Sequence, residues 1–398
     1  MQATQIINTH LKKMCQVIHK KRMKALMIMV EACVQGKKLS VTGLGRAIKN
    51  AVYEKHNIKR ADRLMGNIAL NQERGLIYSM MAKWIIGQHQ QPVILVDWSD
   101  LREDRSYHLL RASLPVGGRA LTIYDEVHPQ KKLANVKVEA RFLQRLKALL
   151  PDNCRPIVIT DAGYRTPWFN AVQALGWDFV GRVGGHTMIS PQGKQDWTRI
   201  EKAFETATKT ARYFGFTDLV KRNPTPCHAY LVKKKQQGRI NKNAYGERSA
   251  MSYSEKLAQR QRTPWFIVTS LEGGGSITKR VINLYKTRMQ IEECFRDIKN
   301  SRWGFSLDEA KISTKFRYEN LLLVGVLATF AVWLTGKVAE LKNVHRQYQA
   351  NTVKTRNILS TFYLGSRVLN KQVLDIKRVD FHQALAVLQE QFKGQCYA

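Results

Sequence analysis

The chain has 398 residues, 44% of them hydrophobic, a composition typical of folded proteins and unlike that of disordered ones. Its 65 Lys and Arg residues against 31 Asp and Glu residues give a formal net charge of +34, so we expect a polyanionic partner, above all nucleic acid. A membrane is disfavoured, because the most apolar run, Leu321 to Leu334, is shorter than the roughly 20 residues that span a bilayer. That run predicts a buried helix. The N-terminus does not resemble a secretory signal, and we expect an intracellular protein.

Residues 1–75 are rich in helix formers and predict a helical DNA-binding domain. A short helix is expected between Leu39 and Asn50, with Ser40 or Thr42 as its N-cap, and a basic helix follows. This pairing is typical of a helix-turn-helix, whose second helix contacts DNA. The candidate DNA-binding residues on that second helix are Lys59, Arg60 and Arg63. The alternative interpretation is an ordinary solvated basic face.

Residues 76–186 alternate between strand-like and helix-like patterns. The expected elements are strands at Pro92 to Asp97, Tyr107 to Leu114 and Arg119 to Tyr124, a helix at Val136 to Leu150, and a strand at Pro156 to Asp161. Three meander strands, a crossover helix and a parallel fourth strand are the order of a ribonuclease H-like sheet. We therefore predict an α/β fold with a ribonuclease H-like catalytic core, an inserted β subdomain, and helical N-terminal and C-terminal regions.

The expected domain boundaries follow from these changes of pattern. They are 1–75 for the helical domain, 76–186 for the first part of the core, 187–262 for the inserted β subdomain with a basic loop, 263–330 for the second part of the core, and 331–398 for the C-terminal helical region. The basic loop begins at Lys233 and is followed by a polar stretch to Arg262. Within the second part of the core we expect one long helix from about 278 to 300.

Asp97 and Asp161 each end a buried, apolar strand. In the expected sheet the first and fourth strands are neighbours, so both carboxylates would face each other at the carboxyl ends of the strands. Two carboxylates that close repel each other, and a hard divalent cation such as Mg²⁺ relieves the repulsion. Taken singly, an acid at a strand end is more often a turn residue. Their matching positions favour a metal site.

The long helix carries polar residues on one face. At about 100° per residue, four side chains fall within an arc of about 60°, namely Tyr285, Arg288, Glu292 and Lys299. Glu293 points roughly 100° away, so Glu292 is the expected third metal ligand. Arg288 and Lys299 would bind phosphate oxygens. The alternative is a charged ridge that only faces solvent.

Asp97, Asp161 and Glu292, together with Tyr285-x2-Arg288-x3-Glu292-x6-Lys299, resemble the signature of the DDE transposases of insertion-sequence family 4. The resemblance covers nearly the whole chain. It implies a cytoplasmic bacterial enzyme that binds double-stranded DNA at transposon ends and at the target. The three carboxylates would be both the catalytic residues and the ligands of two Mg²⁺ ions per active site, for which Mn²⁺ would substitute.

The resemblance also implies a route through a hairpin: the DNA is nicked, the freed 3′-hydroxyl attacks the opposite strand, water reopens the hairpin, and the 3′-end joins the target. Forming a hairpin requires that a base leave the stack. The family resemblance implies that Trp265 stacks on that base while Tyr285, Arg288 and Lys299 hold nearby phosphates. From the residues alone, Trp265 is as easily explained as a core side chain. Met289 lies on the same arc, and we infer an apolar wedge that fills the space the base leaves.

Members of this family act as dimers, so we expect a homodimer in a paired-end complex, with the C-terminal helical region as a candidate interface. Two other functions remain open. A different ribonuclease H-like nuclease, such as a resolvase or an RNA:DNA hybrid hydrolase, would cleave without joining. A non-catalytic basic architectural protein would bind DNA without metal and cut nothing.

Overall fold

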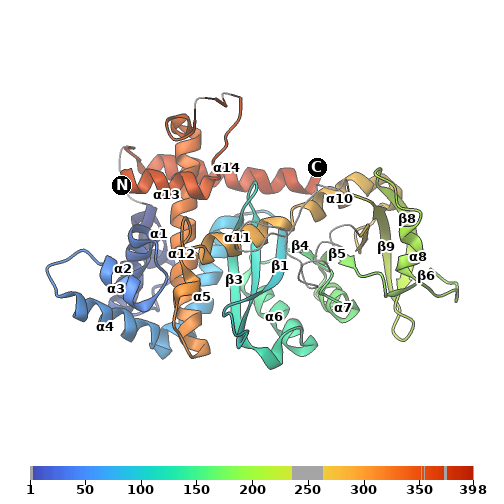
Figure 1. Cartoon of the computed structure of the whole chain (residues 1–398), viewed down its shortest axis with the longest axis horizontal. Coiled ribbons are helices and arrows are strands. Elements are labelled where there is room, and N and C mark those ends of the chain that lie inside the picture. The colour runs from blue at the N-terminus through green and yellow to red at the C-terminus, as the bar shows by residue number, and fades with distance from the viewer. Residues whose placement is uncertain (1–2, 235–262, 351, 354, 372–373, 398) are drawn as a thin grey trace, which may run out of the picture. The chain divides into compact units, whose positions relative to one another are not determined.

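The computed structural model describes residues 3–234, 263–350, 352–353, 355–371 and 374–397. Most of the predicted basic loop, and the polar stretch to Arg262, lie outside the described residues. The chain folds into two compact units (Figure 1). Unit 1 comprises Met1–Pro156 and Thr287–Tyr397, and unit 2 comprises Ile157–Lys286.

Unit 1 begins with the predicted helical region. Its helices are α1 (Ala3–Met14), α2 (Lys20–Gly36), α3 (Val41–Ala47), α4 (Glu54–Met65) and α5 (Ile68–Ile86). Of the two predicted N-cap candidates, Ser40 caps α3 and Thr42 does not: the Ser40 Oγ accepts a hydrogen bond from the Gly43 amide at 3.2 Å. Helices α3 and α4 are in close contact: a Cβ atom on Gly45 would lie 2.5 Å from the Ile58 Cα.

An antiparallel meander follows. Its strands are β1 (Val93–Asp100), β2 (Tyr107–Pro115) and β3 (Ala120–Pro129), in the spatial order β3-β2-β1. Gly117 and Gly118 make the turn between β2 and β3, and both have positive φ angles, 78° and 87°, which glycine adopts at no steric cost. After η1 (Gln130–Lys132), helix α6 (Val136–Leu149) begins where the sequence predicts it.

The second segment of unit 1 supplies its central helix. The elements are α11 (Met289–Lys299), η3 (Leu307–Glu309), α12 (Lys315–Leu341), η4 (Val344–Gln347), α13 (Thr361–Lys371) and α14 (Arg378–Tyr397). Helix α12 packs against α2, α5, α13, α14 and β3, and nearly every residue from Tyr318 to Ala339 is buried (Figure 1). It is the one helix in the described parts of the chain that is long and apolar enough to cross a membrane. Its burial confirms the prediction of a core helix.

Unit 2 is built on a mixed sheet. Its elements are β4 (Ile157–Thr160), α7 (Thr166–Ala174), β5 (Asp178–Val183), β6 (Met188–Pro191), β7 (Thr198–Arg199), α8 (Ile200–Phe204), β8 (Arg212–Leu219), β9 (Thr225–Val232), β10 (Trp265–Thr269), η2 (Gly274–Ile277) and α10 (Thr278–Lys286). The strand order is β4-β5-β10-β9-β8-β6-β7. Strands β4 and β5 are parallel, and β10 is antiparallel to both β5 and β9.

The prediction of one continuous helix from 278 to 300 is wrong. The chain forms two helices, α10 and α11, separated by a turn at Thr287 and Arg288. Here the Gln290 amide donates to the Thr287 carbonyl at 2.9 Å and the Ile291 amide donates to the Arg288 carbonyl at 3.2 Å, a spacing of three residues instead of the four of an α-helix. Tyr285 therefore belongs to α10, and it does not share one uninterrupted helix face with the other three polar residues.

Candidate functional site

In unit 1, two of the predicted carboxylates share one guanidinium group. Asp97 lies on β1, and Glu292 lies in the first turn of α11. Arg288, at the N-cap of α11, places Nη2 2.6 Å from Glu292 Oε1 and Nη1 3.6 Å from Asp97 Oδ2. The side chains of Arg288 and Asp97 are 13% and 15% exposed, whereas that of Glu292 is 39% exposed. Glu292 is thus the solvent-accessible member of the pair.

Lys299 binds the end of β1 from the last turn of α11. Its Nζ donates to Ser99 Oγ at 3.0 Å and to the Asp100 carbonyl. Burial lowers the pKa of the Lys299 ammonium group. Helix α11 is therefore attached to β1 at both of its ends, through Arg288 to Asp97 and through Lys299 to residues 99 and 100. Sequence reasoning identified Lys299 but not the Ser99 and Asp100 acceptors.

Glu292 and its neighbour Glu293 have different partners, as the helical projection predicts. Glu293 pairs with Arg296 at 2.7 Å and with Arg119 at 3.5 Å. Glu292, by contrast, shares the Arg288 guanidinium with Asp97. Met289 opens α11 beside this cluster, half-buried, with its sulfur 3.0 Å from Arg288 Nη2.

Asp161 belongs to unit 2, where it directly follows β4. Its Oδ1 accepts a hydrogen bond from the Gly163 amide at 2.8 Å, and the residue is partly exposed. Within the described part of the chain, no group of three or more His, Cys, Asp or Glu side chains is placed to hold a metal ion. Asp97 and Glu292 nevertheless fit a divalent cation in donor type and charge, because two hard oxygen donors already converge on one cationic group.

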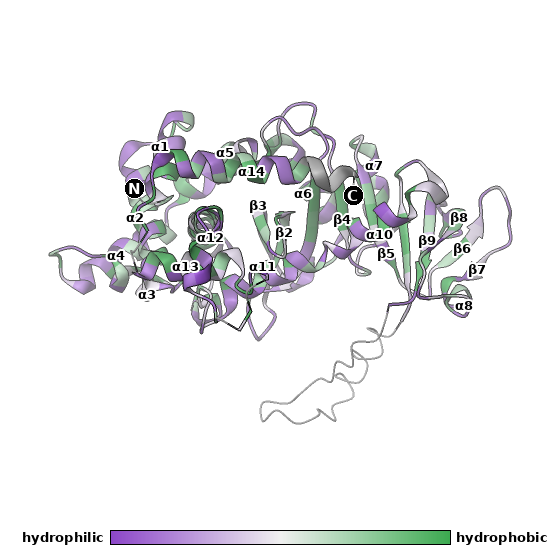
Figure 2. Ribbon diagram, turned by 90° about the horizontal axis from the view of Figure 1, so that it is seen from above, coloured by the Kyte–Doolittle hydropathy of each residue, from purple (hydrophilic) through white to green (hydrophobic). Residues whose placement is uncertain are grey.

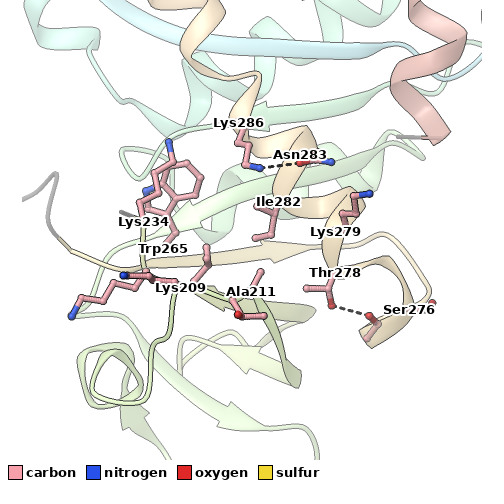
Figure 3. A pocket seen from close by; sticks show the side chains of 14 residues that line it. Lys209, Ala211, Lys234, Trp265, Ser276, Thr278, Lys279, Ile282, Asn283 and Lys286 are labelled. Atoms are coloured by element: carbon pink, nitrogen blue, oxygen red, sulfur yellow. Dashed lines mark hydrogen bonds between the residues drawn. The ribbon is translucent and has the colours of Figure 1, made fainter. Parts of the chain in front are cut away.

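Trp265 lies at the start of β10 and forms one wall of a cavity of about 610 Å³ in unit 2. Its ring contacts Tyr285 edge-on, with 4.8 Å between the ring centroids. Lys234 extends over the Trp265 ring, with Nζ 4.0 Å from the centroid (Figure 3). Five lysines line the cavity, at positions 209, 233, 234, 279 and 286, and no Asp or Glu is among its described lining residues. The cavity is therefore aromatic on one side and strongly basic.

The sequence analysis did not identify the lysines of this cavity as a group. They come from the segment before β8, the segment after β9 and helix α10, so only the fold brings them together. Lys233 and Lys234 were visible as part of a basic run, which the sequence places in a loop. Trp265 is only half-buried, which distinguishes it from the fully buried Phe266 beside it.

The three basic residues predicted to contact DNA lie on α4. Lys59 and Arg63 are exposed and Arg60 is half-buried. The loop between α3 and α4 is held by reciprocal side-chain hydrogen bonds between Asn50 and Asn57, at 2.9 and 3.2 Å. Figure 2 shows mostly hydrophilic colouring along α4. The arrangement is a short helix pair whose second helix presents cations to solvent.

Residues 88–328, more than half of the chain, match the family model described as "Transposase DDE domain". Among solved structures, a cryo-EM structure of a piggyBac transposase synaptic complex with hairpin DNA superimposes with a TM-score of 0.42 and 10% sequence identity, over 93% of this chain and 76% of that chain. No curated protein matches the chain.

Proposed function

Because the chain belongs to the transposase DDE domain family, whose members act on DNA with divalent metal ions, we propose that it is a cut-and-paste DNA transposase. More specifically, we assign it to insertion-sequence family 4, on the spacing of Tyr285, Arg288, Glu292 and Lys299. Its reaction would be endonuclease cleavage at transposon ends followed by strand transfer into target DNA. The chain would work in the bacterial cytoplasm.

The observation that carries this proposal is the position of Arg288 between Asp97 and Glu292. The two carboxylates come from parts of the chain almost 200 residues apart, yet both lie within 4 Å of the same guanidinium. We propose that Asp161 is the third ligand and that two Mg²⁺ ions are the resident cations, with Mn²⁺ as a substitute. Bound divalent cations would activate the attacking oxygen and stabilise the leaving oxygen of an in-line displacement.

Each step then exchanges one P–O bond for another. In the first, a water oxygen attacks the phosphorus at the transposon end, its proton passes to solvent, and the 3′-oxygen leaves. In the second, that 3′-hydroxyl attacks the opposite strand and closes a hairpin, releasing the flanking DNA. Water then opens the hairpin, and the regenerated 3′-hydroxyl attacks a target phosphodiester. No step requires an oxidant, a reductant or a nucleotide cofactor.

The basic and aromatic residues would hold the distorted DNA. Arg288, Lys299 and Tyr285 are proposed to bind phosphates near the cleaved bond. Trp265 is proposed to stack on the base that leaves the helix, since the basic cavity beside its ring suits a nucleotide. Met289 would fill the space that the base vacates.

We also propose how the rest of the chain serves the reaction. Residues 1–75 would bind the transposon end through Lys59, Arg60 and Arg63, and residues 187–262 would form an inserted subdomain of the catalytic core, whose two parts are 76–186 and 263–330. The C-terminal region, 331–398, would contribute to a homodimer that pairs two ends.

The test uses the purified full chain, DNA carrying its own element's end, and Mg²⁺. Glu292→Gln is compared with Glu293→Gln, the adjacent acid that pairs with Arg296 instead. We expect hairpin ends and joined products from the wild type and from Glu293→Gln, and none from Glu292→Gln. Denaturing gels resolve the nick, the hairpin and the joined product separately.

Two other outcomes would replace the proposal. Cleavage without hairpins or joined products would identify another ribonuclease H-like nuclease. Equal DNA binding with and without Mg²⁺, with no cleavage by any variant, would identify an architectural DNA-binding protein.

A further inference from the structure

A row of alternating charges crosses the sheet of unit 1. Asp97 on β1 is the direct cross-strand partner of Arg111 on β2, and Arg111 is the direct partner of Asp125 on β3. Directly opposed residues of antiparallel strands project from the same face of the sheet. The three side chains therefore alternate in charge, minus, plus, minus, along the face on which α11 packs.

Arg111 joins this row to the underside of α11. Its side chain is 1% exposed, with Nη2 3.1 Å from Asp125 Oδ2. On the other side, Nη1 lies 3.7 Å from the Cys294 sulfur, and the guanidinium stands 5.4 Å from the centre of the Phe295 ring. Cys294 and Phe295 follow Glu292 by two and three positions. One buried guanidinium, carried by the strand next to Asp97, thus contacts β3 and the helix that carries Glu292.

Hydrogen bonds also fix the Asp125 end of the row. The Asp125 carboxylate is fully buried and accepts hydrogen bonds from Tyr78 at 2.7 Å and from Arg74 at 3.2 Å. Arg74 also reaches Glu319 on the central helix α12, at 3.2 Å. Arg111 is therefore anchored to α5 and α12 as well as to its own sheet, and its position has little freedom.

Stability alone is a poor explanation for this network. Buried ion pairs often contribute no more than apolar side chains of the same volume, because removing charges from water costs several kcal/mol. Within the described part of the chain, Arg111 Nε is also buried without a hydrogen-bond partner, a further cost. What an apolar replacement would lose is the fixed geometry between strand and helix.

We propose that Arg111 is a positioning residue for the divalent-metal site: it holds α11 on the sheet so that Glu292 and Asp97 converge. This inference rests on the proposed function, because it presumes that these two carboxylates bind metal. Arg111 does not touch DNA or metal in this role. Its effect passes through Cys294 and Phe295 to the backbone of α11.

The test measures Mn²⁺ binding by electron paramagnetic resonance, on the full chain bound to end DNA. Arg111→Lys keeps the positive charge but loses the planar guanidinium group. Arg111→Met removes the charge and keeps a long, unbranched side chain. Residues that orient metal ligands typically change metal affinity by about 10- to 100-fold, so we expect the half-saturating Mn²⁺ concentration to rise at least about 10-fold in both variants. End-DNA binding in EDTA should stay within about 2-fold of wild type, since binding without metal does not use the two carboxylates.

Two further variants keep the test decisive. Arg145→Met breaks another ion pair to a buried carboxylate of β3, that of Glu126, at 3.0 Å, and should leave Mn²⁺ binding unchanged. Cys294→Ala removes the helix side of the contact without touching a buried charge, and should weaken Mn²⁺ binding less than Arg111→Met does. Thermal melting shows whether the Arg111 variants fold. If they do not, Cys294→Ala tests the inference in their place.

Wild-type Mn²⁺ binding in folded Arg111 variants, or in Cys294→Ala when those variants do not fold, would overturn the inference. The same weakening in Arg145→Met as in Arg111→Met would also overturn it, because general destabilisation would then be the cause. Failure of the proposed function looks different: Glu292→Gln would then bind Mn²⁺ as the wild type does, and no variant would cleave DNA.

Discussion

The Arg288 guanidinium donates a hydrogen bond to the Glu292 carboxylate one helical turn away, with 2.6 Å between Nη2 and Oε1. Since the same guanidinium reaches Asp97, its single positive charge already offsets half of the charge of the two carboxylates. A divalent cation bound at the proposed site would therefore compete with Arg288 for the same two carboxylates. A DNA phosphate that draws Arg288 away would favour metal binding.

Arg288→Gln is expected to tighten Mn²⁺ binding by the DNA-free protein by about 10-fold, a change of roughly 1.4 kcal/mol, while slowing cleavage of end DNA. The affinity is measured by electron paramagnetic resonance without DNA. Arg296→Gln, which breaks the comparable pair with Glu293, is the control and should change neither quantity. Unchanged or weaker Mn²⁺ binding in Arg288→Gln would show that the two cations do not compete.

Trp265→Ala should slow hairpin formation by about 10- to 100-fold and leave the first nick nearly unchanged, because one base–aromatic stack contributes about 1–3 kcal/mol. Trp265→Phe keeps an aromatic face and should retain most of the rate. Gel time courses separate the two steps. Trp303→Ala, at a tryptophan of unit 1 that is 41% exposed, is the matched control. If Trp265→Ala slowed the first nick and hairpin formation to the same extent, a folding defect would be the explanation.

Asp297 makes stability depend on pH in mildly acidic solution. Burial raises the pKa of its carboxyl group from 3.8 to about 6, although Arg119 Nε, 2.8 Å away, opposes the shift. Between these values the folded protein binds more protons than the unfolded chain, so the free energy of unfolding falls as pH rises from about 4 to about 6.

Asp297→Asn should lack this dependence. Relative to wild type, the variant should therefore become more stable as pH rises, by up to about 3 kcal/mol across the window. Urea unfolding at pH 4 and pH 7 measures the difference, and Glu309→Gln serves as a control at an exposed carboxylate. Parallel pH profiles for wild type and Asp297→Asn would contradict the prediction.

Gly336→Ala should destabilise unit 1 by at least about 1–3 kcal/mol, the usual cost of overpacking. The added Cβ would lie 1.9 Å from the Thr361 carbonyl oxygen, because the backbones of α12 and α13 are in contact there. Gly75→Ala on α5 is the control: its Cβ would meet no atom closer than 4.0 Å, and alanine should stabilise that helix slightly. Urea unfolding of the wild type and both variants measures the effect. If Gly336→Ala unfolds at the same urea concentration as the wild type, α13 moves aside to accept the added Cβ.

Local patterns predicted the strands and helices of unit 1 well. The strand expected at Pro92 to Asp97 is β1, which continues beyond Asp97 to Asp100, the helix expected at Val136 to Leu150 is α6, and Ser40 caps α3. In each case a short run of apolar residues, or a capping side chain, contains the necessary information. The same short apolar segments also predict the α/β fold and its ribonuclease H-like order of elements.

Features that depend on tertiary contacts were not predictable in the same way. The turn at Thr287 and Arg288 interrupts a segment whose apolar stripe continues on both sides, and it coincides with the boundary between the units. Arg111 and Asp125 look like ordinary surface charges of strands until the register places them opposite each other beneath α11. The lysines of the Trp265 cavity converge only through the fold.

The order in which the ribosome makes this chain has a consequence for unit 1. Its first segment ends at Pro156, and its second begins at Thr287, so all of unit 2 is synthesised in between. Ribosomes add about 5–20 residues per second. Helix α12, against which α2, α5 and β3 pack, is therefore made on the order of ten seconds after these elements. During that interval the apolar faces that pack against α12 lack this partner. A product that stops short of α12 should therefore aggregate, whereas the complete chain buries these faces as its last helices emerge.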